Sequence, residues 1–168
     1  MSQLQVRPAR TADVPRIRSL IDTYSPDRRL LSKETVALYE DLPEFSVAEK
    51  DGQLLGCGAL HVMWEDLAEV RTLAVDPAAM GQGVGAAVLT ELLKRAEDVG
   101  VSRVFVLTFE VEFFARFGFI EIDGTPVSHE VYEQLLRSYD EGVAEFLGLE
   151  RVKPNTLGNT RMLLSLEK

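Results

Sequence analysis

The segment that most constrains the fold of this chain runs from Glu69 to Gly85 and leads straight into a long amphipathic stretch. An apolar strand sequence comes first, then a turn at Asp76-Pro77, then a loop that carries three glycines within five residues. After the loop, apolar residues recur every four positions until Gly100, at Val84, Val88, Leu92 and Ala96. This spacing predicts an amphipathic helix that ends at the glycine, so the segment is a strand, a turn, a glycine loop and a helix.

The glycine loop predicts an anion site at the start of that helix. Backbone N–H groups at a helix N-terminus are unpaired and carry a partial positive charge, and glycine lets a ligand approach the backbone closely. We expect the loop to hold a phosphate or pyrophosphate through Gly81, Gln82, Gly83, Val84, Gly85 and Ala86. A glycine turn that only starts a core helix is the alternative interpretation, and the glycine pattern alone does not decide between the two.

The residues before this segment predict helices and a strand hairpin. Thr11 is the expected N-cap of a first helix, in which Val14, Ile17, Leu20 and Ile21 recur at helical spacing, and Ser32 is the expected cap of a second. Asp51-Gly52 suits a type I′ turn between strands at 45–50 and 54–63. A short strand at 4–8 and a third antiparallel strand at 68–75 complete this half.

The residues after the long helix alternate between strands and helices. The sequence predicts a buried strand at 104–108, a short helix at 112–117, a strand at 119–122, one or two helices at 129–146 and a final strand at 160–166. Hairpins followed by a strand–helix–strand unit predict a single α/β domain over residues 1–168, with a sheet of mixed strand direction.

Composition and charge exclude several classes of protein. The net charge is −9 and no basic stripe is visible, which argues against nucleic-acid binding. No apolar run approaches the length of a membrane span, and the N-terminus lacks a signal-peptide pattern. Cys57 is the single cysteine, and His61 and His129 show no metal-ligand spacing. We therefore expect a cytoplasmic protein without a metal, whose partner is a small molecule.

Two stretches resemble the GNAT superfamily of acetyl-coenzyme A-dependent N-acetyltransferases. Leu73-Ala-Val-Asp-Pro77 followed by Met80-Gly-Gln-Gly-Val-Gly85 is similar to the pyrophosphate-binding motif of that superfamily. The aromatic segment Phe113-Phe-Ala-Arg-Phe-Gly-Phe119 is similar to its second signature. The resemblance implies a mixed, mostly antiparallel central sheet flanked by helices, and acetyl-CoA as co-substrate.

A narrower resemblance is to the acetyltransferase domains of N-acetylglutamate synthases, in their short stand-alone form. Glu69 on the motif strand, Leu107-Thr108 and Gly158-Asn-Thr-Arg-Met-Leu163 carry it. It implies acetylation of the α-amine of glutamate, or of glutamine, at the first step of arginine biosynthesis. A homodimer is an expectation of the same kind.

The chain departs from these patterns at three positions. Met80 stands where the superfamily usually has Gln or Arg, so one side-chain contact near the pyrophosphate is missing. Phe114 stands where many members have a tyrosine that protonates the departing thiolate, so another group or solvent must do this. Gly158 replaces an arginine of the longer synthases, which relocates carboxylate recognition.

The resemblance and the strand geometry together assign candidate roles along one strand. Leu73, Ala74 and Val75 are the expected backbone contacts of the pantetheine arm, with Phe114 as a further cofactor contact. Glu69 is the candidate general base, because an ammonium group must lose a proton before it attacks a thioester. An exposed strand glutamate is the alternative interpretation of Glu69.

Arg71 lies two residues from Glu69 and is therefore expected on the same face of the strand. It either binds a substrate carboxylate or only orients Glu69. The resemblance adds Lys33, Asn159, Thr160 and Lys153 as candidate substrate contacts. Two other functions remain open at this point: acetylation of another amine, such as a protein N-terminus, a polyamine or a drug, and a catalytically weak acyl-CoA-binding sensor.

Overall fold

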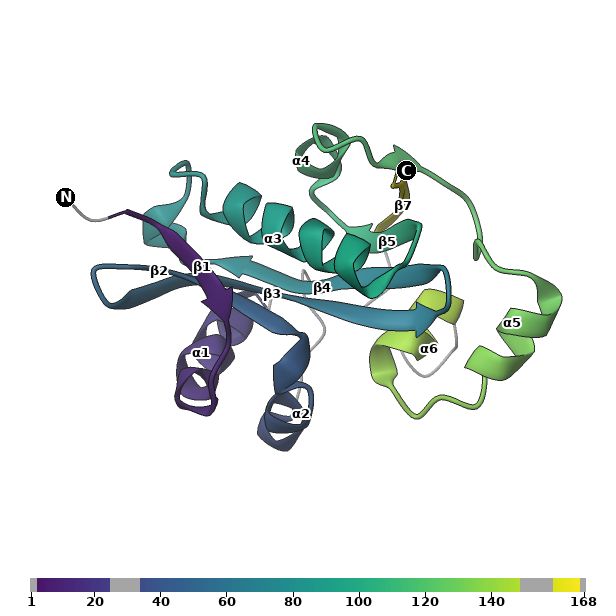
Figure 1. The fold of residues 1–168 in the computed structure, drawn as a ribbon, viewed down its shortest axis with the longest axis horizontal. Coiled ribbons are helices and arrows are strands. Elements are labelled where there is room, and N and C mark those ends of the chain that lie inside the picture. Colours follow the sequence, from purple (N-terminus) through teal and green to yellow (C-terminus); the bar gives the residue numbers. More distant parts are fainter. Residues whose placement is uncertain (1–2, 25–33, 149–158, 167–168) are drawn as a thin grey trace.

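The computed structural model describes residues 3–24, 34–148 and 159–166. Seven strands form one sheet in the order β1-β2-β3-β4-β5-β7-β6. Every neighbouring pair is antiparallel except β4 and β5, which run parallel. The α1 and α2 helices cover one face of the sheet and α3 covers the other (Figure 1). The mixed, mostly antiparallel α/β sheet predicted from the sequence is confirmed.

The first half of the sheet is built by consecutive hairpins. Its elements are β1 (Gln5–Pro8), α1 (Val14–Tyr24), α2 (Thr35–Glu40), β2 (Phe45–Lys50), β3 (Gln53–Trp64) and β4 (Leu67–Val75). Short 3-10 helices precede α1 and β2, η1 (Thr11–Asp13) and η3 (Leu42–Glu44). Asp51 and Gly52 have φ angles of 54° and 76°, which confirms the type I′ turn expected between β2 and β3.

The second half adds the long helix and the strands beyond it. Its elements are η4 (Pro77–Ala79), α3 (Val84–Val99), β5 (Arg103–Thr108), α4 (Val111–Ala115), β6 (Ile120–Glu121), α5 (His129–Leu135), α6 (Glu141–Leu147) and β7 (Thr160–Ser165). Gly83 is the N-cap of α3 and Gly100 its C-cap, as the sequence predicted.

The start of the first helix differs from the prediction. Thr11 begins η1, and Arg10 is the N-cap residue instead. The Asp13 carboxylate accepts a hydrogen bond from the Arg10 backbone N–H at 2.7 Å, and the Arg7 guanidinium donates two more to the same carboxylate. Asp13 thus organises the turn that Thr11 was expected to cap. The α2 helix follows Glu34 as its N-cap residue, and Ser32 lies outside the described residues.

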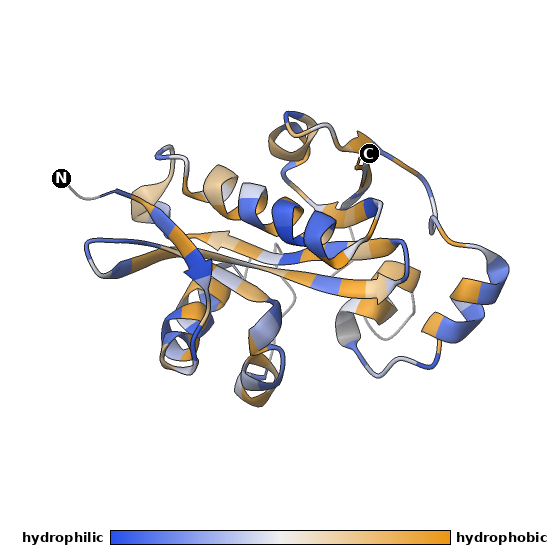
Figure 2. Ribbon diagram, in the orientation of Figure 1, coloured by the Kyte–Doolittle hydropathy of each residue, from blue (hydrophilic) through white to orange (hydrophobic). Residues whose placement is uncertain are grey.

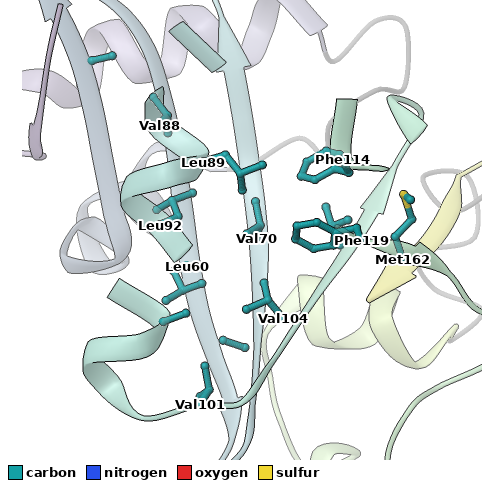
Figure 3. Close-up of a cluster of buried hydrophobic side chains, with 14 of the residues drawn as sticks. Leu60, Val70, Val88, Leu89, Leu92, Val101, Val104, Phe114, Phe119 and Met162 are labelled. Carbon is teal, nitrogen blue, oxygen red and sulfur yellow. The ribbon is translucent and has the colours of Figure 1, made fainter. Parts of the chain in front are cut away.

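The core consists of layers on both faces of the sheet. Val88, Leu89 and Leu92 of α3 are fully buried, and Figure 3 shows them beside side chains of β3, β4 and β5. On the opposite face, α1 buries its apolar positions at Val14, Ile17, Leu20 and Ile21. Figure 2 shows hydrophobic and hydrophilic residues interleaved along both helices. This pattern is expected of helices that bury one side and leave the other in water.

The sheet opens between β4 and β5. These strands pair only over Leu67–Glu69 and Arg103–Phe105, although β5 remains paired with β7 as far as Thr108. Further along β4, the register against β3 shifts between the pairs Ala59↔Arg71 and Cys57↔Ala74, and Thr72 has a φ of 56°. A bulge of this kind bends the strand that carries it. The chain therefore leaves a gap in the middle of its sheet, at the end of β4 that leads to the glycine loop.

None of the helices in the described ranges combines the length and the apolar character needed to traverse a bilayer.

Candidate active site

A cavity of about 510 Å³ occupies the gap between β4 and β5. Its walls come from β4, the glycine loop with the start of α3, the residues around α4, and Gly142 and Glu145 of α6. One end of this cavity is formed by backbone and apolar side chains, and the other by buried charges. We call them the cofactor half and the acceptor half.

The glycine loop forms the outer wall of the cofactor half. Gly81 and Gly83 have φ angles of 82° and 80°, a conformation that favours glycine, and no atom lies within 4 Å of the position of a Cβ on either. The lining residues of this segment are Met80, Gly81, Gly83, Val84, Gly85 and Ala86. The loop thus has the open backbone and the helix N-terminus that a pyrophosphate group requires.

Two residues predicted for this half do not line the cavity. Gln82 is exposed and lies outside the wall, so that only its backbone remains a candidate contact. The Ala74 side chain is buried in the cluster that packs under α1, because alternate residues of a strand face opposite sides of the sheet. Leu73 and Val75 line the cavity as expected.

Tyr24, the last residue of α1, also reaches this wall. Its hydroxyl donates a hydrogen bond to the Val75 backbone carbonyl, on the part of β4 that is not paired with β5. The sequence analysis missed Tyr24, because nothing in the local pattern separates it from an aromatic residue that only closes a helix. The bond ties α1 to the strand segment expected to contact the pantetheine arm.

Phe114 closes the inner end of the cofactor half. Its ring makes edge contacts with Phe113 and Phe119, at centroid distances of 5.1 Å and 5.2 Å, and it lines the cavity. Phe114 is 4% exposed and has no hydroxyl group. It therefore shapes the cavity and cannot donate a proton.

The acceptor half is organised around an ion pair on β4. Arg71 Nε donates a hydrogen bond to Glu69 Oε1 at 2.7 Å, with 8% of the arginine side chain and 3% of the glutamate side chain exposed. Burial raises the pKa of Glu69, against the opposing effect of the Arg71 guanidinium. Burial lowers the pKa of Arg71, but Glu69 and Asp140 outweigh it and leave this pKa above its usual value.

The start of α6 packs directly on Arg71. Arg71 Nη1 lies 2.7 Å from Oδ1 of Asp140, whose side chain also caps α6 by accepting the Val143 N–H at 3.0 Å. A Cβ on Gly142 would lie 2.4 Å from Arg71 Cζ, so only a residue without a side chain fits between the helix and the guanidinium. Gly142 and Asp140 were not identified from the sequence, since their partner is about seventy residues away along the chain.

The far end of α6 is held by β7. Arg161 Nη1 donates to the Phe146 carbonyl at 2.6 Å, and Arg161 Nη2 donates to the Glu145 carbonyl at 3.3 Å. Glu145 follows Gly142 by one helical turn, and both line the cavity. Burial, and next the negative charge of Glu69, raise the pKa of the Glu145 carboxyl to about 8.

Residues 14–119, which include β4, the glycine loop, α3 and α4, match the Acetyltransferase (GNAT) family. This chain belongs to the GNAT family. Its acetyl donor is therefore acetyl-CoA.

Similar GNAT proteins include enzymes named for amino-acid acetylation. The chain is 60% identical over 164 residues to the amino-acid acetyltransferase of Mycobacterium tuberculosis, covering 96% of this chain and 94% of that protein. It is also similar to the crystal structure of Rv2747 from Mycobacterium tuberculosis in complex with CoA and NLQ. That match has 59% identity and a TM-score of 0.94, and covers 97% of this chain and 99% of the other.

A longer relative matches this GNAT chain over only part of its own length. N-acetylglutamate synthase from Neisseria gonorrhoeae, complexed with coenzyme A and N-acetyl-glutamate, matches with 26% identity and a TM-score of 0.78. The match covers 99% of this chain but 36% of the synthase. The present chain therefore corresponds to about a third of that protein.

The structure brings together only some of the predicted substrate contacts of this GNAT domain. Glu69, Arg71 and Asn159 line the cavity. Thr160 begins β7 opposite Thr108 and is not part of the cavity wall. Lys33 and Lys153 lie outside the described residues. Within the described ranges, no group of His, Cys, Asp and Glu side chains is arranged to hold a metal ion.

Cys57 is a core residue of the sheet. It is fully buried under α1, on the opposite side from the long helix, and burial raises the pKa of its thiol to about 12. A thiol with so high a pKa is not a nucleophile at neutral pH. This argues against a mechanism in which Cys57 carries the acetyl group.

Proposed function

We propose that this protein transfers the acetyl group of acetyl-CoA to the α-amine of L-glutamate, with L-glutamine as the second candidate acceptor. The observation that carries the proposal is the similarity, over nearly the full length of both chains, to the amino-acid acetyltransferase of Mycobacterium tuberculosis. The N-acetylglutamate synthase solved with coenzyme A and N-acetyl-glutamate supports the same acceptor class.

In this proposal the cofactor half holds and orients the acetyl donor. Backbone N–H groups at the start of α3 bind the pyrophosphate, next to Gly81, Gly83 and Gly85. Leu73 and Val75 offer backbone groups on a stretch of β4 that has no β5 partner. One amide of this stretch stabilises the oxyanion that develops when the thioester is attacked.

Glu69 is the proposed general base, acting through a water molecule. Burial raises its pKa, which is the direction that favours a general base, because such a base works best when its pKa approaches the working pH. The Arg71 contact at 2.7 Å fixes the position of the carboxylate. The carboxylate is thereby held at the acceptor end of the cavity.

Arg71 is the proposed partner of a substrate carboxylate. Within the described residues, its Nη2 atom is buried without a hydrogen-bond partner. A buried donor left unsatisfied costs about 1–3 kcal/mol, so a ligand that accepts from it gains correspondingly. Asn159 offers a second polar contact in the same wall. Thr160, Lys33 and Lys153 remain proposals that rest on the resemblance alone.

The biological setting is a further part of the proposal. Acetylation of glutamate would be the first step of arginine biosynthesis, carried out in the cytoplasm by a homodimer. Light scattering of the purified protein tests the dimer, and growth of an arginine-requiring strain that lacks its own glutamate acetyltransferase tests the pathway.

A panel of amino acids tests the acceptor. The purified protein is incubated with acetyl-CoA and each of the common amino acids, and release of the CoA thiol is measured. We expect glutamate or glutamine to give the highest kcat/KM, with aspartate and polyamines far below. Turnover confined to polyamines or to peptide N-termini would overturn the proposal.

A further inference from the structure

Glu145 is a carboxylate in the wall of the acceptor half that the proposed reaction does not yet use. It lies on α6, one turn after Gly142, and its neighbours Ala144 and Phe146 are buried in the core. The helix is fixed at both ends, by Asp140 on Arg71 and by Arg161 on the last carbonyls. The backbone of Glu145 is therefore held in place by contacts at both ends of the helix.

The charges around Glu145 leave it without a partner of its own. Among the described residues, no side chain lies within ion-pair or hydrogen-bond distance of its carboxylate, although Arg161 contacts its backbone carbonyl. Arg71 of β4 is already shared between Glu69 and Asp140. Arg161 of β7 donates to backbone carbonyls. The surrounding charges are thus Glu69, Arg71, Asp140 and Arg161, and neither of the two cations contacts the Glu145 carboxylate.

We propose that Glu145 binds the α-ammonium group of the acceptor amino acid, as a specificity-determining residue of the acceptor half. This inference rests on the proposed function, since it assumes an acceptor that carries an ammonium group. A carboxylate that faces a cavity and lacks a cation within the protein forms a charge-assisted hydrogen bond with an ammonium ligand. Glu69 is less available for this contact, because Arg71 already donates to it and it is almost completely buried.

The protonation of Glu145 makes the contact depend on pH. In the empty site its pKa is about 8, so the carboxyl is mostly protonated at neutral pH. An ammonium ion favours the charged form of a neighbouring carboxylate and lowers its pKa. Binding of a cationic amine at neutral pH therefore releases a proton from Glu145 to solvent, and the affinity rises with pH until the carboxyl is already ionised.

Two ligands and two variants test this assignment. L-glutamate and glutarate share both carboxylates, but glutarate lacks the amine. Their Kd values are measured by calorimetry on the protein saturated with CoA, which binds without turnover, at pH values on either side of 8. The variant is Glu145→Gln, which keeps the shape and cannot ionise. The control is Glu110→Gln, the same substitution at an exposed carboxylate in the cofactor-half wall of the same cavity.

We expect wild type to bind glutamate more tightly than glutarate. Above about pH 8, Glu145→Gln should reduce this preference on the order of ten- to a hundredfold, which is what a hydrogen bond to a charged group contributes. The reduction shrinks towards about pH 6, where Glu145 is protonated in wild type. Glutamate binding near neutral pH releases a proton in wild type and in Glu110→Gln, but not in Glu145→Gln. Buffers of different ionisation enthalpy measure this release.

The outcomes distinguish a failure of the Glu145 assignment from a failure of the proposed acceptor. Equal loss of affinity for glutamate and glutarate in Glu145→Gln would give Glu145 a structural role and overturn the inference. An unchanged preference with unchanged proton release would overturn it as well. If wild type bound neither ligand while acetylating another amine, the proposed acceptor would fail and the ammonium assignment for glutamate with it.

Discussion

The two halves of the cavity are built in different ways. The cofactor half comes from one continuous stretch of chain, from β4 through the glycine loop into α3, with Phe114 closing its end. The acceptor half combines Glu69 and Arg71 of β4 with Gly142 and Glu145 of α6, and α6 is in turn held by Arg161 of β7. The first half relies on backbone groups and the second on buried charges. In the proposed reaction, a local segment thus binds the acetyl donor, while long-range contacts build the part that selects the amine.

The comparison predicts that removing a charge from the acceptor half lowers turnover without weakening the binding of CoA. We expect Glu69→Gln to lower kcat for acetylation of glutamate on the order of a hundredfold or more, the usual contribution of a general base. Affinity for CoA should stay at the wild-type value, because Glu69 lies away from the glycine loop. Steady-state thiol release and a CoA titration measure the two quantities. Unchanged turnover would remove Glu69 from the mechanism.

Ionisation of the partly buried Glu145 carboxyl should also lower the stability of the folded protein. Because the pKa of Glu145 is raised to about 8, the folded state holds a proton that the unfolded chain loses near the ordinary Glu pKa of about 4.3. The free energy of unfolding is therefore expected to fall as the pH rises between these values, and to level off above the upper one. Glu145→Gln removes this loss, so it should be more stable than wild type by on the order of 5 kcal/mol above about pH 8.

Urea unfolding at several pH values measures the effect. Near about pH 4 the variant and wild type should differ little, because Glu145 is protonated in both the folded and the unfolded state there. A difference that stays constant over the whole pH range would contradict the raised pKa.

Two helical glycines, one in each half, allow a matched test of packing. An alanine at Gly142 places its Cβ 2.4 Å from Arg71 Cζ, whereas one at Gly85 meets its nearest neighbours, Phe113 and Val75, at 3.5 Å. We expect Gly142→Ala to displace the guanidinium or α6 and to raise KM for the acceptor about tenfold, since small misplacements in a site are costly. Gly85→Ala should leave that KM unchanged. Equal acceptor KM values for the two variants would show that Gly142 does not position Arg71.

The smallest expected effect is in the backbone of the cofactor half. Gly83 has a φ of 80° and open space where a Cβ would lie, so Gly83→Ala adds strain without a clash. The strain costs about 1 kcal/mol of stability. We expect weaker CoA binding because the start of α3 shifts, with the acceptor KM unchanged at saturating acetyl-CoA. An effect on the acceptor KM alone would contradict the division of the cavity into two halves.

The sequence predicted the cofactor half better than the acceptor half, for a physical reason. The glycine loop, the helix from Val84 to Val99 and the β2–β3 turn depend on neighbours in the chain, and all three lie where the periodicity and turn chemistry placed them. Glu69 and Arg71 were correctly expected on the same face of the strand, because residues two apart on a strand share a face.

What could not be predicted depends on contacts between distant parts of the chain. Gly142 is informative only once α6 is known to pack on Arg71, and Tyr24 only once α1 is known to reach Val75. Ala74 and Gln82 were predicted as backbone contacts because they lie within the motif, but neither lines the cavity, and the Ala74 side chain packs under α1. Thr11 is not the cap because it is already the first residue of η1, in which the Asp13 carboxylate accepts the Arg10 backbone N–H.

The bulge at Thr72 has a consequence for how such an enzyme diversifies. It lies on β4 between Arg71 of the acceptor half and Leu73 of the cofactor half. Inserting or deleting a residue in this strand would shift both sets of groups at once, so both functions would be lost together. Changes of length are tolerable only outside it, and new acceptor preferences are expected to arise by substitution on α6 and β7. A lineage can thus alter its choice of amine there while this strand keeps the donor chemistry intact.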